Sequence, residues 1–346
     1  NLRKIGMVSL LSGVLLGVLI AYVQDVLDDR FGSPEEMSSQ LGVPILAIVR
    51  QLDALQGEGL DTVHTKTMPE SVETEEFRTL GTSITLGAEV TDRVLVSSSE
   101  PGDGKTTISA NLAVSFAQAG HRTLVLDCDL RKPGMTTLLG LKGQPGVADI
   151  LHDAGEPGAA AEQLIHHTDV PGLDVIPAGL RRPNPAELLS GSNLPELLAW
   201  ADSRYDRVLV DCPPVLAVSD AQIVGRLVDG AILVVRPAKN HRRLVQRACD
   251  SFASTGSKVL GVVANGITGE GAGYGYGYGY GYGYGYGYGY GHDDDAPQEQ
   301  ASTDETELPT GAVAGSIGDA RATGGTALER LMAGKSKDAK SEQRAA

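Results

Sequence analysis

Short apolar runs alternate with amphipathic stretches from Glu73 to about Ile267, and this alternation is the main feature of the chain. Each run has the length and composition of a strand that is covered on both faces. We predict strands over residues 93–97, 123–127, 173–177, 207–211, 231–235 and 258–264, with helical patterns between most of them. Such alternation predicts an α/β fold, a mostly parallel sheet flanked by helices, with ligands at the carboxyl ends of the strands.

The first run, residues 94–96, is followed by a glycine-rich turn and then by a helical pattern. Ile108, Leu112 and Phe116 recur every four residues in this helix, and Gly120 supplies its C-terminal stop. Because the helix follows the turn directly, the unpaired N–H groups of its N-terminus face the turn, where the helix dipole favours an anion.

The turn carries the end of a phosphate-binding pattern. In GxxxxGK[ST], backbone N–H groups surround phosphates, the lysine neutralises their oxygens and the hydroxyl residue ligates magnesium. A turn without a ligand is the alternative, but lysine and threonine stand in register after a glycine, although Ser99 replaces the first glycine. We therefore predict nucleotide contacts from Ser99, Glu100, Pro101, Gly102, Asp103, Gly104, Lys105, Thr106 and Thr107.

Three aspartates stand at the carboxyl ends of two later predicted strands. Asp127 and Asp129 follow one apolar run, and Asp211 ends another. Carboxylates at strand ends beside a phosphate loop suit magnesium coordination and the positioning of a water or hydroxyl group. One such aspartate is more often a turn residue, whereas three beside a phosphate loop favour a catalytic role.

Residues 5–23 contain no charged side chain, and this is about the length that spans a bilayer as a helix. The alternatives are a buried core helix and a secretory signal peptide, but the apolar region is long and no small-residue cleavage site follows it. We expect one transmembrane helix over residues 1–24. Arg3 and Lys4 favour a cytoplasmic N-terminus, but a nucleotide site after the span must itself face the cytoplasm, and we expect a span further upstream to set that orientation.

Two stretches have the signals of a helix start, a capping residue followed by proline and glutamate. Gly42 ends the first of these helices, and residues 51–72 are polar and irregular, so we expect a juxtamembrane helix and a linker over residues 25–72. The two sets are Ser33, Pro34 and Glu36, and Asn184, Pro185 and Glu187.

The chain becomes low in complexity after the predicted core. Residues 269–292 are a Gly-Tyr repeat, and residues 293–346 are rich in Asp, Glu, Ala, Gly, Ser and Thr. Neither composition favours a packed core, so we predict that the tail is disordered. The alternating strands and helices before it predict a nucleotide-binding domain over residues 73–268. The tyrosines of the repeat are Tyr274, Tyr276, Tyr278, Tyr280, Tyr282, Tyr284, Tyr286, Tyr288 and Tyr290.

Charge and cysteine usage exclude some classes of function. The net charge of −15 argues against nucleic acid as a partner, because phosphate neutralisation needs a basic surface. Cys128, Cys212 and Cys249 lack paired spacing, which favours a reducing compartment and no zinc site. His166 and His167 are adjacent, so they would not share a helix face as metal ligands do, and we expect them at the surface.

The blocks SSSEPGDGKTT, LVLDCDLRKP and VLVDCPP resemble the Walker A, A′ and B motifs of the bacterial tyrosine kinases that accompany polysaccharide co-polymerases. The block PAGLRRPNPAELL, the segment SPEE…LGVPILAIV and the tyrosine-rich tail match too, so the likeness covers roughly residues 5 to 290. The resemblance implies a P-loop NTPase of the deviant Walker type that uses ATP and Mg²⁺. It also implies a kinase domain on the cytoplasmic side of the inner membrane, after a chain-length-determinant module that would precede Asn1.

The same resemblance implies a role for each site residue. Lys105 would contact the phosphates, Thr106 would bind magnesium, Asp127 and Asp129 would act on the acceptor hydroxyl and the metal, and Asp211 would hold magnesium through water. A tyrosine, with a pKa near 10, needs a positioned carboxylate to take its proton, and we predict Asp127 for this task.

The expected acceptors are the tail tyrosines of a neighbouring copy, which a flexible repeat with a reach of roughly 23 Å could approach. The implied partners are further copies of the chain, polysaccharide polymerisation and export proteins, a phosphotyrosine phosphatase and the membrane. The family uses a Glu-x-x-Arg-x-x-Arg pattern for ring assembly. Glu75 and Arg78 fit that pattern, but Gly81 stands where the second arginine belongs. Ring formation is therefore absent or made by different contacts.

Two other functions stay open at this point. Partitioning and cell-division ATPases of the same loop class carry an early lysine, in KGGxGKT, where this chain has Glu100. A regulatory subunit that binds ATP only to organise the polysaccharide machinery would share all of these motifs. The Gly-Tyr repeat could also be a sticky spacer that arose by repeat expansion.

Overall fold

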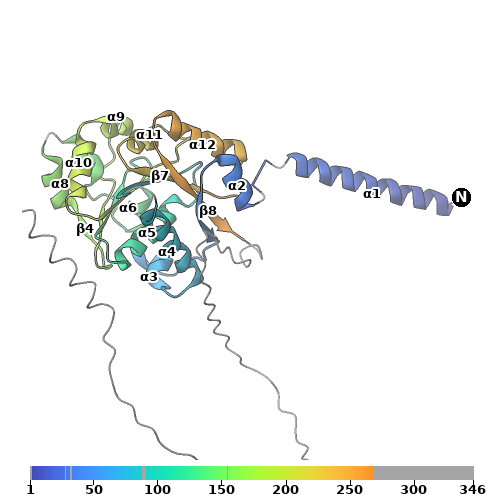
Figure 1. Ribbon diagram of the computed structural model, residues 1–346, viewed down its shortest axis with the longest axis horizontal. Coiled ribbons are helices and arrows are strands. Elements are labelled where there is room, and N and C mark those ends of the chain that lie inside the picture. The colour runs from blue at the N-terminus through green and yellow to red at the C-terminus, as the bar shows by residue number, and fades with distance from the viewer. Residues whose placement is uncertain (1, 28, 32, 88–90, 154, 269–346) are drawn as a thin grey trace, which may run out of the picture. The chain divides into compact units, whose positions relative to one another are not determined.

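A single eight-stranded sheet forms the centre of the domain, and its strands β7 and β8 lie side by side in Figure 1. The strand order is β1-β8-β7-β2-β6-β3-β5-β4. The computed structural model describes residues 2–27, 29–31, 33–87, 91–153 and 155–268. Every strand pairing is parallel except that of β4 with β5. The strands are β1 (Ile45–Arg50), β2 (Arg93–Ser98), β3 (Thr123–Asp127), β4 (His166–His167), β5 (Leu173–Ile176), β6 (Arg207–Asp211), β7 (Gly230–Val235) and β8 (Val259–Ile267). The predicted α/β fold with a mostly parallel sheet is confirmed.

Helices cover both faces of this sheet. The α-helices are α1 (Leu2–Leu27), α2 (Pro34–Leu41), α3 (His64–Thr67), α4 (Val72–Thr85), α5 (Lys105–Gln118), α6 (Gly134–Leu138), α7 (Val147–His152), α8 (Pro157–Leu164), α9 (Pro185–Ser190), α10 (Asn193–Asp202), α11 (Asp220–Gly225) and α12 (Arg242–Ser254), and the short 3₁₀ helix η1 is Gly59–Thr62.

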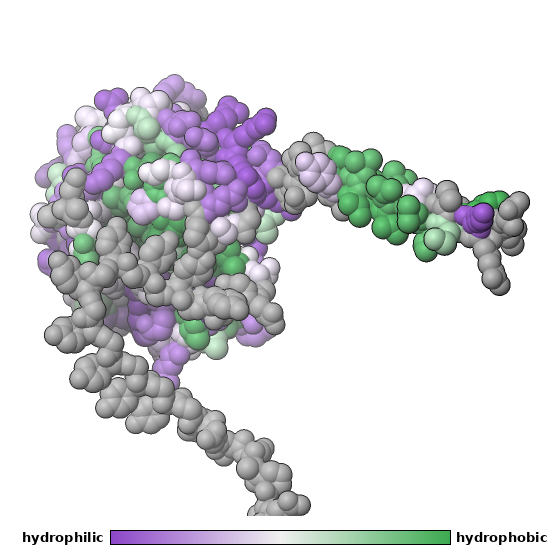
Figure 2. Space-filling view, turned by 45° about the vertical axis from the view of Figure 1, so that its right-hand side comes forward, coloured by the Kyte–Doolittle hydropathy of each residue, from purple (hydrophilic) through white to green (hydrophobic). Residues whose placement is uncertain are grey.

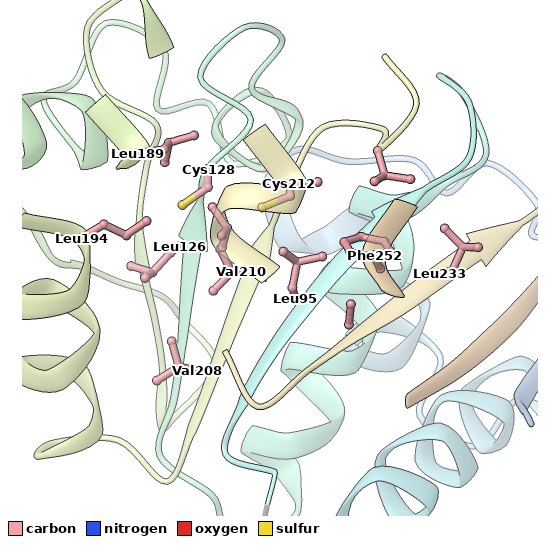
Figure 3. Packing of buried hydrophobic residues seen from close by; sticks show 14 of the residues in the cluster. Leu95, Leu126, Cys128, Leu189, Leu194, Val208, Val210, Cys212, Leu233 and Phe252 are labelled. Atoms are coloured by element: carbon pink, nitrogen blue, oxygen red, sulfur yellow. The ribbon is translucent and has the colours of Figure 1, made fainter. Parts of the chain in front are cut away.

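The strands are apolar on both faces because each face has its own core. In β2, Val94 and Val96 belong to the core shared with α4 and α5, whereas Leu95 belongs to the core shared with α10 and α12. Figure 3 shows the second core, in which Leu95 and Val210 of the strands lie in the same buried layer as Phe252 of α12. Continuous apolar runs are the pattern expected for a parallel sheet covered in this way.

Each of the six predicted strands is present, with ends that differ by no more than a few residues. Strands β1 and β4 were not predicted. Strand β1 lies before Glu73, where the regular alternation starts, and pairs at the sheet edge with β8. Strand β4 has only two residues, and its His167 is exposed with Nδ1 2.7 Å from Asp174 Oδ1.

The prediction of an irregular linker over residues 51–72 is wrong for the central part of this stretch. It contains η1 and α3, and both Leu60 and Val63 are buried. Thr65 is also buried, and its backbone N–H donates to Asn111 Oδ1 of α5 at 2.9 Å. The polar composition of this stretch hid a few anchoring residues, which attach it to the domain.

One of the two predicted helix caps is confirmed. Ser33 accepts a hydrogen bond from the backbone N–H of Glu36 at 3.2 Å, and Gly42 ends α2 in the left-handed conformation. The prediction of the second cap is wrong, because the side chain of Asn184 does not accept a hydrogen bond from the helix backbone. Asn184 has φ 51°, and its Nδ2 donates to Glu187 Oε2 at 3.1 Å instead of its oxygen accepting a backbone N–H of α9.

The predicted apolar helix near the N-terminus is present as α1, and it carries exposed apolar side chains such as Leu10, Leu15 and Leu19 (Figure 2). Among the described residues, however, no helix meets the length and apolarity required to cross a membrane. The transmembrane helix predicted over residues 1–24 therefore has no support from the described residues. The predictions for the Gly-Tyr repeat and the acidic tail concern residues 269–346, outside the described part.

Candidate functional site

The predicted phosphate loop connects β2 at the centre of the sheet to the first turn of α5. Gly102 and Gly104 have φ values of 83° and 97°, a backbone conformation that favours glycine. A Cβ atom at Gly104 would also lie 2.1 Å from Asn265 Nδ2, so only glycine fits there without rearrangement. The loop therefore has its shape because these two positions lack side chains.

The first turn of α5 is open to an anion. Gly104 is its N-cap, and no side chain within the described part of the chain caps the helix. The backbone N–H groups of such a turn need acceptors, and phosphate oxygens are suitable ones. Pro101, Gly102 and Thr107 are exposed around this turn, so the site is accessible from solvent.

The structure brings the predicted lysine, threonine and two of the predicted aspartates together. Lys105 Nζ lies 3.0 Å from Asp129 Oδ2 and 3.6 Å from Asp211 Oδ2. Thr106 Oγ1 donates to Asp211 Oδ2 at 2.8 Å. These contacts arise because β3 and β6 are neighbours with Asp127 opposite Asp211, so the carboxylates leave the sheet at the same edge.

Charge in this cluster is unevenly balanced. Burial lowers the pKa of Lys105, but the carboxylates of Asp211 and Asp129 outweigh it, so the pKa is raised from its ordinary value. Burial raises the pKa of Asp211, against the effects of Lys105 and of the Thr106 hydroxyl. Lys105 thus pairs with two buried carboxylates, those of Asp129 and Asp211, and the carboxyl group of Asp127 lies close enough to affect it. Carboxyl groups outnumber the lysine in this cluster, so a further positive charge would be favourable there.

Asp127, the predicted catalytic base, is buried and held by hydrogen bonds within the protein. It is fully buried, and its Oδ2 accepts hydrogen bonds from the backbone N–H and the Oγ1 of Thr136, at 2.8 and 2.7 Å. Burial and the nearby Asp211 raise its pKa to about 7, although the bonds from Thr136 act in the opposite direction. A carboxyl group with this pKa can accept and release a proton near neutral pH, as a general base must. The role of Asp127 as the catalytic base stays a prediction.

Magnesium fits the oxygen atoms of this cluster. Within the described ranges, no group of three or more His, Cys, Asp or Glu side chains has the arrangement of a complete metal site. Magnesium, however, is usually held by one or two carboxylates, water and substrate phosphates. Thr106, Asp129 and Asp211 can supply the protein's share, and the excess negative charge favours a divalent cation.

Several side chains in and around the site were not predicted from the sequence. Arg131 makes a two-pronged ion pair with the fully buried Asp220, with N–O distances of 2.8 and 3.1 Å, and so joins the loop after β3 to α11. Lys239 and Asn240 contact the phosphate loop from the segment after β7. Nothing local marks Asp220, but Lys239 and Asn240 follow the carboxyl end of a predicted strand, where ligand-binding residues gather.

Asp149 anchors the start of the block PAGLRRPNPAELL. Its Oδ2 accepts from the backbone N–H groups of Gly146 and Leu180, both at 2.9 Å, and its Oδ1 lies 2.9 Å from a guanidinium nitrogen of Arg182. Burial alone would raise the pKa of Asp149, but these three donors outweigh it and the pKa is lowered. The ionised carboxylate therefore stabilises the fold.

Asp149→Ala is expected to lower the free energy of unfolding at pH 7 by about 2 kcal/mol, because three donors lose a buried acceptor. The stabilisation is fully present above the ordinary carboxyl pKa of 3.8 and is lost as the pH falls through the lowered folded-state value. The difference between wild type and variant should thus shrink in acid. Urea unfolding at several pH values measures it. Asp153→Ala, at the exposed end of the same helix, is the control, and an equal loss in both variants would contradict the assignment.

Comparison with known sequences gives one family and several relatives. A family model described as "ParA: NUBPL iron-transfer P-loop NTPase" matches residues 89–269. The chain is 40% identical over 204 residues to the tyrosine-protein kinase YwqD of Bacillus subtilis, which covers 58% of this chain and 84% of that protein. It is 33% identical over 205 residues to the putative tyrosine-protein kinase CapB of Staphylococcus aureus, covering 59% and 87% of the two chains. Against the tyrosine-protein kinase wzc of Salmonella typhimurium, identity is 40% over 201 residues, but the chain spans only 27% of that protein.

Solved structures agree with these relatives. The kinase domain of the Escherichia coli tyrosine kinase ETK superposes with a TM-score of 0.62 at 28% identity, covering 74% of this chain and all of that domain. The chimerical protein CapA2B2 gives a TM-score of 0.62 at 31% identity, covering 68% and 99% of the two chains. The identity and coverage of these relatives show that this chain belongs to the family of bacterial tyrosine-protein kinases, which is built on the P-loop NTPase fold.

Proposed function

We propose that the chain is an ATP-dependent protein-tyrosine kinase that phosphorylates the tyrosines of its own C-terminal repeat in trans. The observation that carries this proposal is the cluster in which Lys105 lies between Asp129 and Asp211, directly beside the uncapped N-terminus of α5. This arrangement can hold a polyphosphate and neutralise it, and it offers carboxylates to an acceptor hydroxyl.

The proposed transfer uses these residues as follows. The tyrosine oxygen forms a bond to the γ-phosphorus of ATP, the bond from that phosphorus to the bridging oxygen breaks, and ADP leaves. The phenolic proton passes to the Asp127–Asp129 pair, while Lys105 and the N–H groups of α5 stabilise the charge on the phosphates. A bound Mg²⁺ would neutralise charge on the β- and γ-oxygens. Thr106 and Asp211, 2.8 Å apart, would hold that ion.

The test is to incubate the protein with ATP and Mg²⁺ and to map phosphotyrosine by mass spectrometry. We expect phosphate on tyrosines between Tyr274 and Tyr290. To test transfer in trans, an Asp129→Asn chain with an intact tail is mixed with an active chain whose tail tyrosines are changed to phenylalanine. Phosphate on the Asp129→Asn chain supports the proposal. ATP turnover without any phosphotyrosine would instead favour the regulatory ATPase.

We further propose that copies of the chain assemble through contacts that do not need a second arginine on α4. Arg78 forms an ion pair with Glu75 within the helix, and Gly81 is buried against α5, where an added Cβ would lie 3.4 Å from Phe116 Cε1. Because each tail phosphate adds about −1.5 to −2 charge near pH 7, modification should loosen the assembly. Sizing the protein before and after phosphatase treatment tests this, and an unchanged mass would contradict it.

A place at the cytoplasmic side of the inner membrane, beside polysaccharide polymerisation and export proteins and a phosphotyrosine phosphatase, is also part of the proposal. The exposed apolar side chains of α1 support membrane association, because a surface of this kind is normally covered by lipid or protein. Flotation with lipid vesicles tests it. A chain that lacks residues 1–27 should stay at the bottom of the gradient, and equal flotation of both forms would contradict this part.

A further inference from the structure

A cluster of polar side chains joins the phosphate loop to the segment after β7. At its centre is Asp103, which is fully buried. Its Oδ1 accepts hydrogen bonds from Lys239 Nζ at 2.7 Å and from Asn240 Nδ2 at 3.0 Å. Its Oδ2 accepts from Ser99 Oγ at 3.1 Å and from the backbone N–H of Glu100 at 2.8 Å. One carboxylate therefore connects both ends of the loop to residues far along the chain.

Lys239 and Asn240 make further bonds to the same loop. Lys239 Nζ also donates to the carbonyl oxygen of Pro101 at 2.6 Å. Asn240, which is fully buried, donates from Nδ2 to Glu100 Oε2 at 2.7 Å, and its Oδ1 accepts from the backbone N–H of Arg236 at 2.6 Å. The amide of Asn240 is thus held on both sides, and it ties the loop to the carboxyl end of β7.

We propose that Lys239 and Asn240 are positioning residues that hold the phosphate loop in its nucleotide-accepting shape through Asp103, and that they thereby set the affinity for ATP and ADP. This inference rests on the proposed function only in taking a nucleotide as the ligand. Ordering a flexible loop costs conformational entropy, and a loop that is held in place before binding does not have to meet this cost when the ligand arrives.

The charges of the cluster point to the same role. The loop carries two carboxylates, Glu100 and Asp103, next to the place where phosphates would bind, and like charges there oppose an anion. Lys239 compensates one of them, and its Nζ would be 3.9 Å from a Cβ placed on Gly102 at the exposed tip of the loop. Asn240 supplies hydrogen-bond donors to both carboxylates. Loss of Lys239 would therefore loosen the loop and also leave negative charge beside the phosphates.

The experiment measures the dissociation constant of a fluorescent ADP for the full chain with Mg²⁺. Lys239→Met should raise Kd about tenfold, as expected when a charge-assisted hydrogen bond is lost. Lys239→Arg, which can still reach Asp103 and the Pro101 carbonyl, should bind within about threefold of wild type. Lys142→Met, at an exposed lysine between α6 and α7, is the matched control and should bind as wild type does.

A second variant keeps the inference testable if one substitution disturbs folding. Asn240→Asp preserves the shape and the acceptor for Arg236 but places a third carboxylate against Glu100 and Asp103, so its Kd should rise at least as much as that of Lys239→Met. Thermal unfolding of the nucleotide-free proteins separates folding from binding. A Kd within twofold of wild type in folded Lys239→Met would overturn the inference, as would equal weakening by Lys239→Arg.

The readout also separates this inference from the proposed function. Binding of ADP needs no phosphoryl transfer, so a chain that binds ADP but forms no phosphotyrosine would refute the kinase proposal and leave the role of Lys239 intact. A wild-type chain that does not bind ADP would refute both.

Discussion

Lys105→Met is expected to lower the rate of phosphotyrosine formation by roughly a hundred- to a thousandfold, the range seen when one preorganised group that stabilises transition-state charge is removed. Lys105 Nζ lies 3.0 Å from Asp129 Oδ2 and 3.6 Å from Asp211 Oδ2, at the start of α5. Methionine has a similar length but no charge, so the phosphates would lose their cation and the carboxylates would repel them. The initial rate of tail phosphorylation at saturating ATP measures the effect.

The control for this experiment must separate chemistry from folding. Without Lys105 the fully buried carboxylate of Asp211 loses the cation that favours its charged form, and we expect it to take up a proton more readily. Circular dichroism and thermal unfolding should show that the variant is folded. Lys142→Met, at an exposed site, should keep the wild-type rate. A Lys105→Met chain that is folded and retains more than a tenth of the wild-type rate would mean that phosphoryl transfer occurs elsewhere.

Gly134→Ala is expected to abolish most activity and to destabilise the fold by about 2 kcal/mol, in the range of other overpacking substitutions. A Cβ at Gly134 would lie 2.3 Å from Thr106 Oγ1 and 3.1 Å from Thr106 Cβ. The threonine side chain would have to turn away from Asp211, to which it now donates at 2.8 Å. The hydroxyl that we assign to magnesium would then leave its place.

A double substitution tests this explanation. Thr106→Ala removes the hydroxyl group that the added methyl group at position 134 would approach most closely, so the double variant should recover stability relative to Gly134→Ala while remaining inactive. Gly155→Ala is the matched control, because nothing lies within 4 Å of a Cβ there. Urea unfolding and the tail-phosphorylation rate measure the two effects. Full activity in Gly134→Ala would show that the close approach of α6 to Thr106 has no functional importance.

Local features of the chain were predictable because neighbouring residues produce them. The apolar run of β2, the glycine turn and the repeat of Ile108, Leu112 and Phe116 are adjacent in sequence, and together they specify a strand, a phosphate loop and a helix. The placement of Asp127 and Asp211 at strand ends followed from the same reasoning.

Errors occurred where an element depends on distant partners. The stretch around α3 looks polar in sequence, but Thr65 bonds Asn111, which is 46 residues away. Asn184 is a residue type that commonly caps helices, yet its side chain donates to Glu187 and does not cap α9. Gly81 could be seen to replace an arginine, but only the packing of α4 on α5 shows that it is buried there.

The sequence by itself determined the fold class, the family resemblance and which residue types could hold a nucleotide, because these depend on local periodicity and on short motifs. The tertiary structure decided how those residues meet. The pairing of β3 with β6 places Asp127 opposite Asp211, and the packing of α5 on that edge places Lys105 and Thr106 against Asp211. The contact of Lys239 with Asp103 spans 136 residues of chain. Strand order and helix packing are properties of the whole core, so no local pattern could have specified these contacts.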